Sequence, residues 1–211
     1  ERWNLRWFAP QAEVSLCGHG TLAAAQALVQ AGHASRDTAI RFATQAGDLA
    51  AVVGADGIAM DFPALPATPV DPPAGLADAL GVMPMAVGQS GSRLLVELAN
   101  DRNVLDLKPD FQALARIDAE VVVVTALATA NGFDFVSRVF APRVGVQEDH
   151  VSGSTHCILG PYWSPRLHKR ELVGFQASSR DGVVEVDVAQ DGQRVTLRGH
   201  AVTIFRGELL V

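Results

Sequence analysis

Two short glycine-rich segments carry side chains that can move protons. Residues 17–21 read CGHGT, and residues 152–156 read SGSTH a few positions after an aspartate. An imidazole and a carboxylate held in one dry cleft can have their proton affinities moved toward neutral pH, which suits general acid–base chemistry. The residue types therefore predict proton transfer, with these candidates for the proton carriers: Cys17, His19, Asp149, Ser154 and His156.

Each of these segments precedes an apolar stretch that is typical of a helix. The start of a helix offers unpaired backbone N–H groups and a positive dipole end, and glycine lets an anion approach them closely. The pattern predicts that both loops hold a small carboxylate. Three simpler interpretations stay open: the glycines only form turns, His19 caps a helix, and Cys17 is a small buried residue.

The two loops belong to an internal repeat. Residues 6–10 (RWFAP) recur at 138–142 as RVFAP, and the stretches at 42–47 and 175–182 each begin with Phe and lead into an apolar strand. The loops keep the same order between these landmarks, so Cys17 corresponds to Ser152 and His19 to Ser154. A period this long predicts a duplicated domain. We expect a first half at 1–88 and a second half at 89–211, with the last strand crossing back to the first half.

Both halves have the same expected elements. A strand ends in the Phe-Ala-Pro turn, a glycine-rich loop opens a helix, and a hairpin follows. We expect one helix at 21–30, and a second near Ser154 that Pro161 stops or kinks. The prolines of 63–73 predict an extended connector and 88–92 a loop. Strands are expected at 49–53, 58–62, 121–125, 133–140, 183–188 and 194–198.

Composition excludes several function classes. The chain has 211 residues, 48% of them hydrophobic, which is enough for a substantial core. Seventeen basic against 23 acidic residues give a net charge of −6, which argues against nucleic acid as a partner. No apolar stretch reaches the ~18 residues needed to span a bilayer, and no signal peptide is evident. Two cysteines, without zinc-site spacing, favour a reducing cytoplasm and no metal.

Three groups of residues resemble the signatures of the PhzF-like phenazine-biosynthesis family. The first is residues 6–25, from RWFAP through CGHGT to the Ala-rich stretch. The second is residues 148–163, which read EDHVSGSTHC followed by ILGPYW. The third is QASSRDG at 176–182, with Arg194-Val195 and residues 199–201. The resemblance covers nearly the whole chain in order.

The resemblance implies an α+β fold of the diaminopimelate-epimerase-like type. That fold has two pseudo-symmetric halves, each a mixed and mostly antiparallel sheet curled around a central helix, with the active site between them. It also implies a cofactor-independent isomerase that acts on a small cyclic or amino carboxylate by acid–base proton transfer. The partner is then a small molecule, with no nucleic acid and no membrane, and a homodimer is compatible with the fold.

Site residues carry over by position. The resemblance assigns substrate and proton handling to His19, Asp149 and Ser154. It assigns carboxylate binding to the two loops, through Cys17, Gly18, Gly20, Thr21, Ser152, Gly153 and Thr155. Related racemases use one cysteine from each half, and here the second position is Ser152, which disfavours two-thiol epimerisation.

The family's glutamate base lies upstream of the first signature, so its position falls before Glu1. The resemblance therefore predicts either a further N-terminal segment, bearing this base and strands of the first half, or a truncated homologue. Two alternative functions stay open: a non-catalytic protein that binds small carboxylates, and an amino-acid racemase or epimerase.

Overall fold

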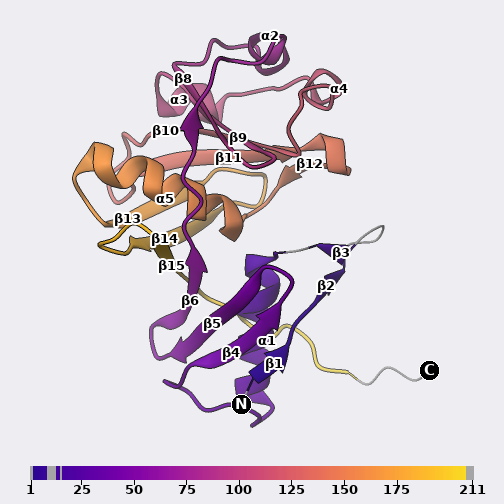
Figure 1. Ribbon diagram of the computed structural model, residues 1–211, viewed down its shortest axis with the longest axis vertical. Helices are drawn as coiled ribbons and strands as arrows, with labels where there is room; N and C mark the ends of the chain where they lie inside the picture. The colour runs from indigo at the N-terminus through magenta and orange to yellow at the C-terminus, as the bar shows by residue number, and fades with distance from the viewer. Residues whose placement is uncertain (1, 9–12, 15, 208–211) are drawn as a thin grey trace. The chain divides into compact units, whose positions relative to one another are not determined.

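The computed structural model describes residues 2–8, 13–14 and 16–207. The chain divides into two compact units, Glu1–Phe62 together with Arg198–Val211, and Pro63–Leu197 (Figure 1). The Phe-Ala-Pro turn expected in the first half, at Ala9 and Pro10, lies outside the described residues. Within the described residues, no helix has both the length and the apolar character required to cross a membrane.

The first unit is a small sheet with one long helix. Its elements are β1 (Arg2–Asn4), β2 (Trp7–Phe8), β3 (Glu13–Val14), α1 (Gly18–Gln30), β4 (Ile40–Thr44), β5 (Gly47–Gly54) and β6 (Gly57–Pro63). In the sheet, β1 runs parallel to β4, while β4, β5 and β6 form an antiparallel meander. The short strands β2 and β3 form a separate antiparallel pair.

Alternation of apolar residues accounts for this sheet. Every second residue of β5 and β6 is buried, so their apolar side chains share one face. Helix α1 packs against β5 and buries Thr21 and Ala25 (Figure 1). The hairpin expected at 49–53 and 58–62 is confirmed, and the turn closes at Gly57, whose φ of +127° favours glycine.

The second unit is a larger mixed sheet with helices on both faces. Its elements are β7 (Thr68–Pro69), α2 (Leu76–Leu80), β8 (Ala86–Ser90), β9 (Arg93–Glu97), α3 (Asp101–Leu105), α4 (Phe111–Leu114), β10 (Val121–Leu127), β11 (Phe135–Ala141), the 3-10 turn η1 (Pro142–Val144), β12 (Val146–Asp149), α5 (Gly153–Leu167), β13 (Glu171–Gln176), β14 (Gly182–Val188) and β15 (Arg194–Gly199).

Strand β10 lies at the centre of this unit, and both of its faces are covered. It runs parallel to β9 and antiparallel to β11. Val122, Val124 and Ala126 belong to a core cluster that also contains residues of α2, α3 and α4. On the other face, the Oγ1 atom of Thr125 accepts a hydrogen bond of 3.1 Å from Trp163 Nε1 of α5. Burial on both faces explains the continuous apolar run VVVV, which lacks the alternation of a half-exposed strand.

The helix that follows the second loop contradicts one of the two expectations for Pro161. A stop there is wrong, because α5 continues through Pro161 and Pro165 to Leu167; a kink at Pro161 stays a prediction. Proline cannot donate to the carbonyl four residues earlier, which here is that of Cys157. The backbone N–H of Leu65 donates to this Cys157 carbonyl instead, at 2.9 Å. A tertiary hydrogen bond therefore satisfies the oxygen that the proline leaves free.

One expectation about the middle of the chain is corrected. The loop expected at 88–92 is wrong for Gly88–Ser90, which belong to β8; only Gly91 and Ser92 form the turn to β9. The reason is pairing, because β7 and β8 join β9 and extend the sheet of the second unit. The compact units divide after Phe62, and the expected halves at 1–88 and 89–211 stay a prediction.

The closest packing of α5 on its sheet is at Gly160. A Cβ atom at this position would lie 2.7 Å from Val186 Cγ1 and 3.1 Å from Val188 Cγ2. We predict that Gly160→Ala lowers the free energy of unfolding by about 1–3 kcal/mol, because the added methyl overpacks the contact with β14. Chemical denaturation measures this. The double variant with Val186→Ala should recover part of the loss, and additive losses would contradict the packing argument.

Candidate functional site

The first loop places a thiol and an imidazole together at the start of α1. Cys17 is the N-cap residue, with an extended backbone, and its Sγ lies 3.4 Å from His19 Nε2. Cys17 is half-buried and His19 is exposed. Thr21 closes the first turn, since its backbone N–H and its Oγ1 both donate to the Cys17 carbonyl, at 3.0 and 2.7 Å.

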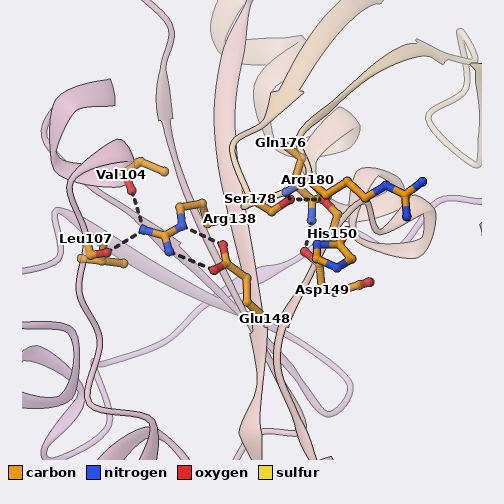
Figure 2. Close-up of polar contacts among 9 residues, drawn as sticks. All are labelled: Val104, Leu107, Arg138, Glu148, Asp149, His150, Gln176, Ser178 and Arg180. Atoms are coloured by element: carbon orange, nitrogen blue, oxygen red, sulfur yellow. Dashed lines mark hydrogen bonds and ion pairs between the residues drawn. The ribbon is translucent and has the colours of Figure 1, made fainter.

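The second loop is held by a buried glutamine on β13. The side chain of Gln176 is fully buried; its Oε1 accepts from the backbone N–H of Ser152 at 2.9 Å, and its Nε2 donates to the Asp149 carbonyl at 2.8 Å. Beside it, the hydroxyl of Ser178 donates to the carbonyl of His150 at 2.8 Å, as Figure 2 shows. These bonds fix the backbone between β12 and α5.

Both helices begin without a side-chain cap. Neither Cys17 nor Ser152 accepts a hydrogen bond from the first turn of its helix, and neither first turn contains an acidic residue. The first N–H groups of a helix have no carbonyl partner within the helix. The helix dipole adds positive potential at the same place. Each loop therefore presents backbone donors and positive potential suited to a carboxylate oxygen.

A matched pair of hairpins leads into the two loops. In the pair β2–β3, the guanidinium of Arg6 bonds both carboxylate oxygens of Glu13, at 2.8 and 2.7 Å. In the pair β11–β12, Arg138 does the same with Glu148, at 2.8 and 3.0 Å (Figure 2). Each guanidinium also lies over the Phe ring two residues later, 4.9 and 5.1 Å from the ring centroids of Phe8 and Phe140. The internal repeat thus extends to side-chain geometry.

The two hairpins differ in burial. The Arg6 side chain is 63% exposed, whereas the Arg138 side chain is 12% exposed and also donates to the carbonyls of Val104 and Leu107 (Figure 2). Exposed ion pairs contribute little to stability, and a buried pair positions its neighbours when its hydrogen bonds are satisfied. The second loop therefore has a more rigid support than the first.

His156 lies behind the second loop and stays neutral. Its side chain is fully buried, and Nδ1 bonds the Ser152 carbonyl at 2.9 Å, so the ring proton is on Nδ1. Its Nε2 has no hydrogen-bond partner among the described residues and faces Gly174, where a Cβ would lie 3.1 Å away. Burial lowers the pKa of His156 to about 4. We therefore assign this residue to loop support and not to proton transfer.

The other candidates take different positions. Asp149 and Ser154 are half-buried, and the Asp149 carboxylate forms no hydrogen bond or ion pair among the described residues, while its backbone carbonyl accepts from Gln176. Thr21 and Thr155 are buried and donate to the carbonyls of the preceding N-cap residues, so their hydroxyls close the helix turns. Their hydroxyls are therefore occupied, and so is the backbone N–H of Thr21, which also donates to the Cys17 carbonyl. Gly18 is buried, and Gly20 and Gly153 are half-buried in the first turns.

Sequence reasoning did not select Gln176 or Arg138 as site residues. Both stand in recognised motifs, but a glutamine at the end of a strand and an arginine inside one carry no local sign of tertiary contacts. The repeat offered one usable signal, because Arg precedes Phe by two positions in both copies and an acidic residue follows in each. Among the described residues, no three His, Cys, Asp or Glu side chains group to hold a metal.

The neutral His156 predicts a pH dependence of stability. Its pKa is about 4 in the fold and 6.5 as a model group, so the unfolded chain binds a proton first on acidification. The free energy of unfolding should fall as the pH drops from 6.5 to 4, by up to about 3 kcal/mol, and this contribution should level off below pH 4. His156→Asn keeps a hydrogen-bond donor near the position of Nδ1 and should remove this pH-dependent loss of stability. His150→Asn is the control and should leave the pH dependence in place. Denaturation at several pH values measures it.

The Gln176 side chain gives a second prediction. Gln176→Leu removes both bonds to the loop and leaves a buried N–H and a buried carbonyl unpaired, which should cost about 1–3 kcal/mol of unfolding free energy. Hydrogen exchange of the Ser152 amide should accelerate as well. The same change at exposed Gln147 on β12 is the control, and equal losses from the two variants would exclude the proposed clamp.

Comparisons with known proteins agree with this architecture. The family model described as phenazine biosynthesis-like protein, PhzC-PhzF, matches residues 1–207. A Halalkalibacterium halodurans protein named as an uncharacterized isomerase is 42% identical over 210 residues, which are 99% of this chain and 78% of that protein. A crystal structure of a PhzF-family phenazine biosynthesis protein from Enterococcus faecalis has a TM-score of 0.90 at 34% identity, covering 99% of this chain and 78% of that one.

A more distant structure shares the fold alone. A probable proline racemase from Agrobacterium radiobacter has a TM-score of 0.62 at 13% identity, covering 96% of this chain and 72% of that one. The expected α+β fold class is therefore confirmed, with the epimerase-like arrangement that the resemblance implied. Since the family model spans nearly the whole chain and a relative is this similar, the chain belongs to the PhzC-PhzF family of phenazine biosynthesis-like proteins.

Proposed function

We propose that this protein is an isomerase that moves a proton within a small carboxylate substrate by acid–base chemistry, without a cofactor. The observation that carries the proposal is the pair of uncapped helix starts described above. The side chains of Cys17 and Ser152 accept no hydrogen bond from the backbone N–H groups in the first turns of α1 and α5, and neither turn contains an acidic residue. Membership of a family with a relative named as an isomerase supports a catalytic role over simple binding.

Carboxylate binding falls to the two loops in this proposal. Backbone N–H groups around Gly18 and Gly20 in α1, and around Gly153 and Thr155 in α5, would donate to substrate oxygens. The Ser154 hydroxyl would add one more hydrogen bond to the carboxylate. Cys17 and Ser152 are next to these donors in the chain. The hydroxyls of Thr21 and Thr155 stabilise the same turns by donating to the carbonyls of Cys17 and Ser152.

Proton handling falls to His19 and Asp149. The imidazole of His19 is exposed, and an imidazole can both accept and return a proton. The carboxylate of Asp149 can orient a substrate amine or hydroxyl, since no described side chain bonds it and Gln176 holds its backbone. A fixed support matters, because general acid–base catalysis requires hydrogen-bond reach to the moving proton.

The proposal predicts incorporation of solvent deuterium. Incubation of the protein with a panel of small cyclic and amino carboxylates in D₂O should give one compound that gains carbon-bound deuterium, which proton NMR detects. His19→Gln and Asp149→Asn should each lower the rate by about 10²-fold or more, as expected for loss of an acid–base group. Ser154→Ala should mainly raise the half-saturating concentration, by roughly tenfold, because it removes one hydrogen bond.

His150→Gln is the matched control for Asp149. Its ring is exposed and only its backbone carbonyl supports the loop, so exchange should stay unchanged. Saturable binding of a carboxylate with no exchange would favour the alternative of a non-catalytic binding protein. Exchange that survives both His19→Gln and Asp149→Asn would refute the assigned roles.

A further inference from the structure

Cys17 has the surroundings of a reactive thiol. Its Sγ lies 3.4 Å from Nε2 of His19, the second residue of a helix of 13 residues. With the ring proton on Nδ1, His19 Nε2 can accept the thiol proton, and the thiolate is the nucleophilic form of cysteine. The positive end of the α1 dipole lies at the same place and attracts negative charge on the sulfur.

A second observation comes independently from Trp7 on β2. This residue is only 8% exposed, and its indole N–H has no hydrogen-bond partner among the described residues. A buried N–H without an acceptor is uncommon and calls for an explanation. This donor lies close to the Cys17 thiol: a Cβ atom on Gly20 would lie 3.0 Å from Trp7 Nε1 and 3.0 Å from Cys17 Sγ. The two atoms therefore both lie beside Gly20, within about 6 Å of each other, and glycine is the residue that lets them approach so closely.

The other cysteine provides an internal contrast. Cys157 is fully buried within α5, and its Sγ lies 3.8 Å from the Gly153 carbonyl. A reagent in solution cannot reach this sulfur unless the protein opens, because the residue is 0% exposed. Cys17 is half-buried. The same chain therefore carries one half-buried and one fully buried thiol, and we expect only the first to react with a small molecule in the folded protein.

We propose that Cys17 is a site of reversible modification by small disulfides, and that the modification closes the α1 loop to carboxylates. His19 Nε2 takes the thiol proton, and the Cys17 sulfur attacks one sulfur of the disulfide RS–SR. The new S–S bond forms as the old one breaks, Cys17 is oxidised, and the leaving group departs as RS⁻. His19 returns the proton to give RSH. The indole N–H of Trp7 would stabilise the charge on sulfur during attack.

The effect on binding rests on the proposed function, whereas the thiol chemistry does not. A group attached to Cys17 would stand at the N-terminus of α1, beside the backbone donors assigned to the substrate. The two parts can be separated, because adduct formation is measured by mass and carboxylate exchange by NMR.

The experiment incubates the folded protein with glutathione disulfide at neutral pH and follows intact mass with peptide mapping. One adduct is expected, on Cys17, and dithiothreitol should reverse it. Cys17→Ser should abolish it and Cys157→Ser should leave its rate unchanged. His19→Gln should slow it by roughly tenfold or more, through loss of the neighbouring base. Trp7→Phe keeps an aromatic ring and should slow it severalfold, with melting temperature measured to confirm folding.

Three results would each overturn one part of the proposal: the thiol chemistry, the role of His19, or the placement of the substrate at α1. Adduct formation on Cys17 only in denaturant, or at a rate equal to that of Cys157, overturns the thiol proposal. An adduct-formation rate that is unchanged in His19→Gln overturns the role of the imidazole. The melting temperature of this variant shows separately whether it is folded. Rapid modification of Cys17 that leaves deuterium exchange into the carboxylate unchanged supports the thiol site and refutes the placement of the substrate at α1.

Discussion

The second loop depends on one buried amide. Gln176 bonds the Asp149 carbonyl and the Ser152 amide at once, so it joins the end of β12 to the start of α5. A buried amide group must find partners for its donors and acceptors, and this glutamine meets that requirement with the loop backbone itself. The carboxylate of Asp149 and the uncapped turn of α5 thereby keep a constant relation. His156 reinforces the same point through its bond to the Ser152 carbonyl.

Duplication explains why the two loops are alike and divergence explains why they differ. Both are reached through a hairpin in which an arginine clamps a glutamate and lies over a phenylalanine. In the second unit that arginine is buried and also holds two carbonyls, while in the first it is exposed. The N-cap residues differ as well, a thiol in one copy and a hydroxyl in the other. The second hairpin is therefore anchored to further backbone groups, whereas the arginine of the first is open to solvent.

Burial keeps the histidine behind the second loop neutral. His156 stays uncharged because burial outweighs its single hydrogen bond to a carbonyl. Positive charge behind the loop is thus avoided, and the positive potential comes from the helix starts instead. Fixed dipoles of this kind are already oriented before a substrate arrives, so they need little reorganisation during the reaction. The arrangement suits chemistry in which an anion must be held while a proton moves.

Local pattern determined the repeat, the hairpins of β5–β6 and β14–β15, the helix that follows each loop and the α+β class, because periodicity and glycine-rich turns act over a few residues. Signature residues also led to the family. Only the tertiary structure decided that α5 passes through Pro161, since the freed Cys157 carbonyl is satisfied by Leu65, far away in the sequence. It likewise decided that Gly88–Ser90 pair as a strand, that Gln176 clamps the loop, and that Thr21 and Thr155 turn inward. Each of these outcomes depends on contacts between residues far apart in the sequence, and a local pattern of residue types does not specify which distant residue will form the contact.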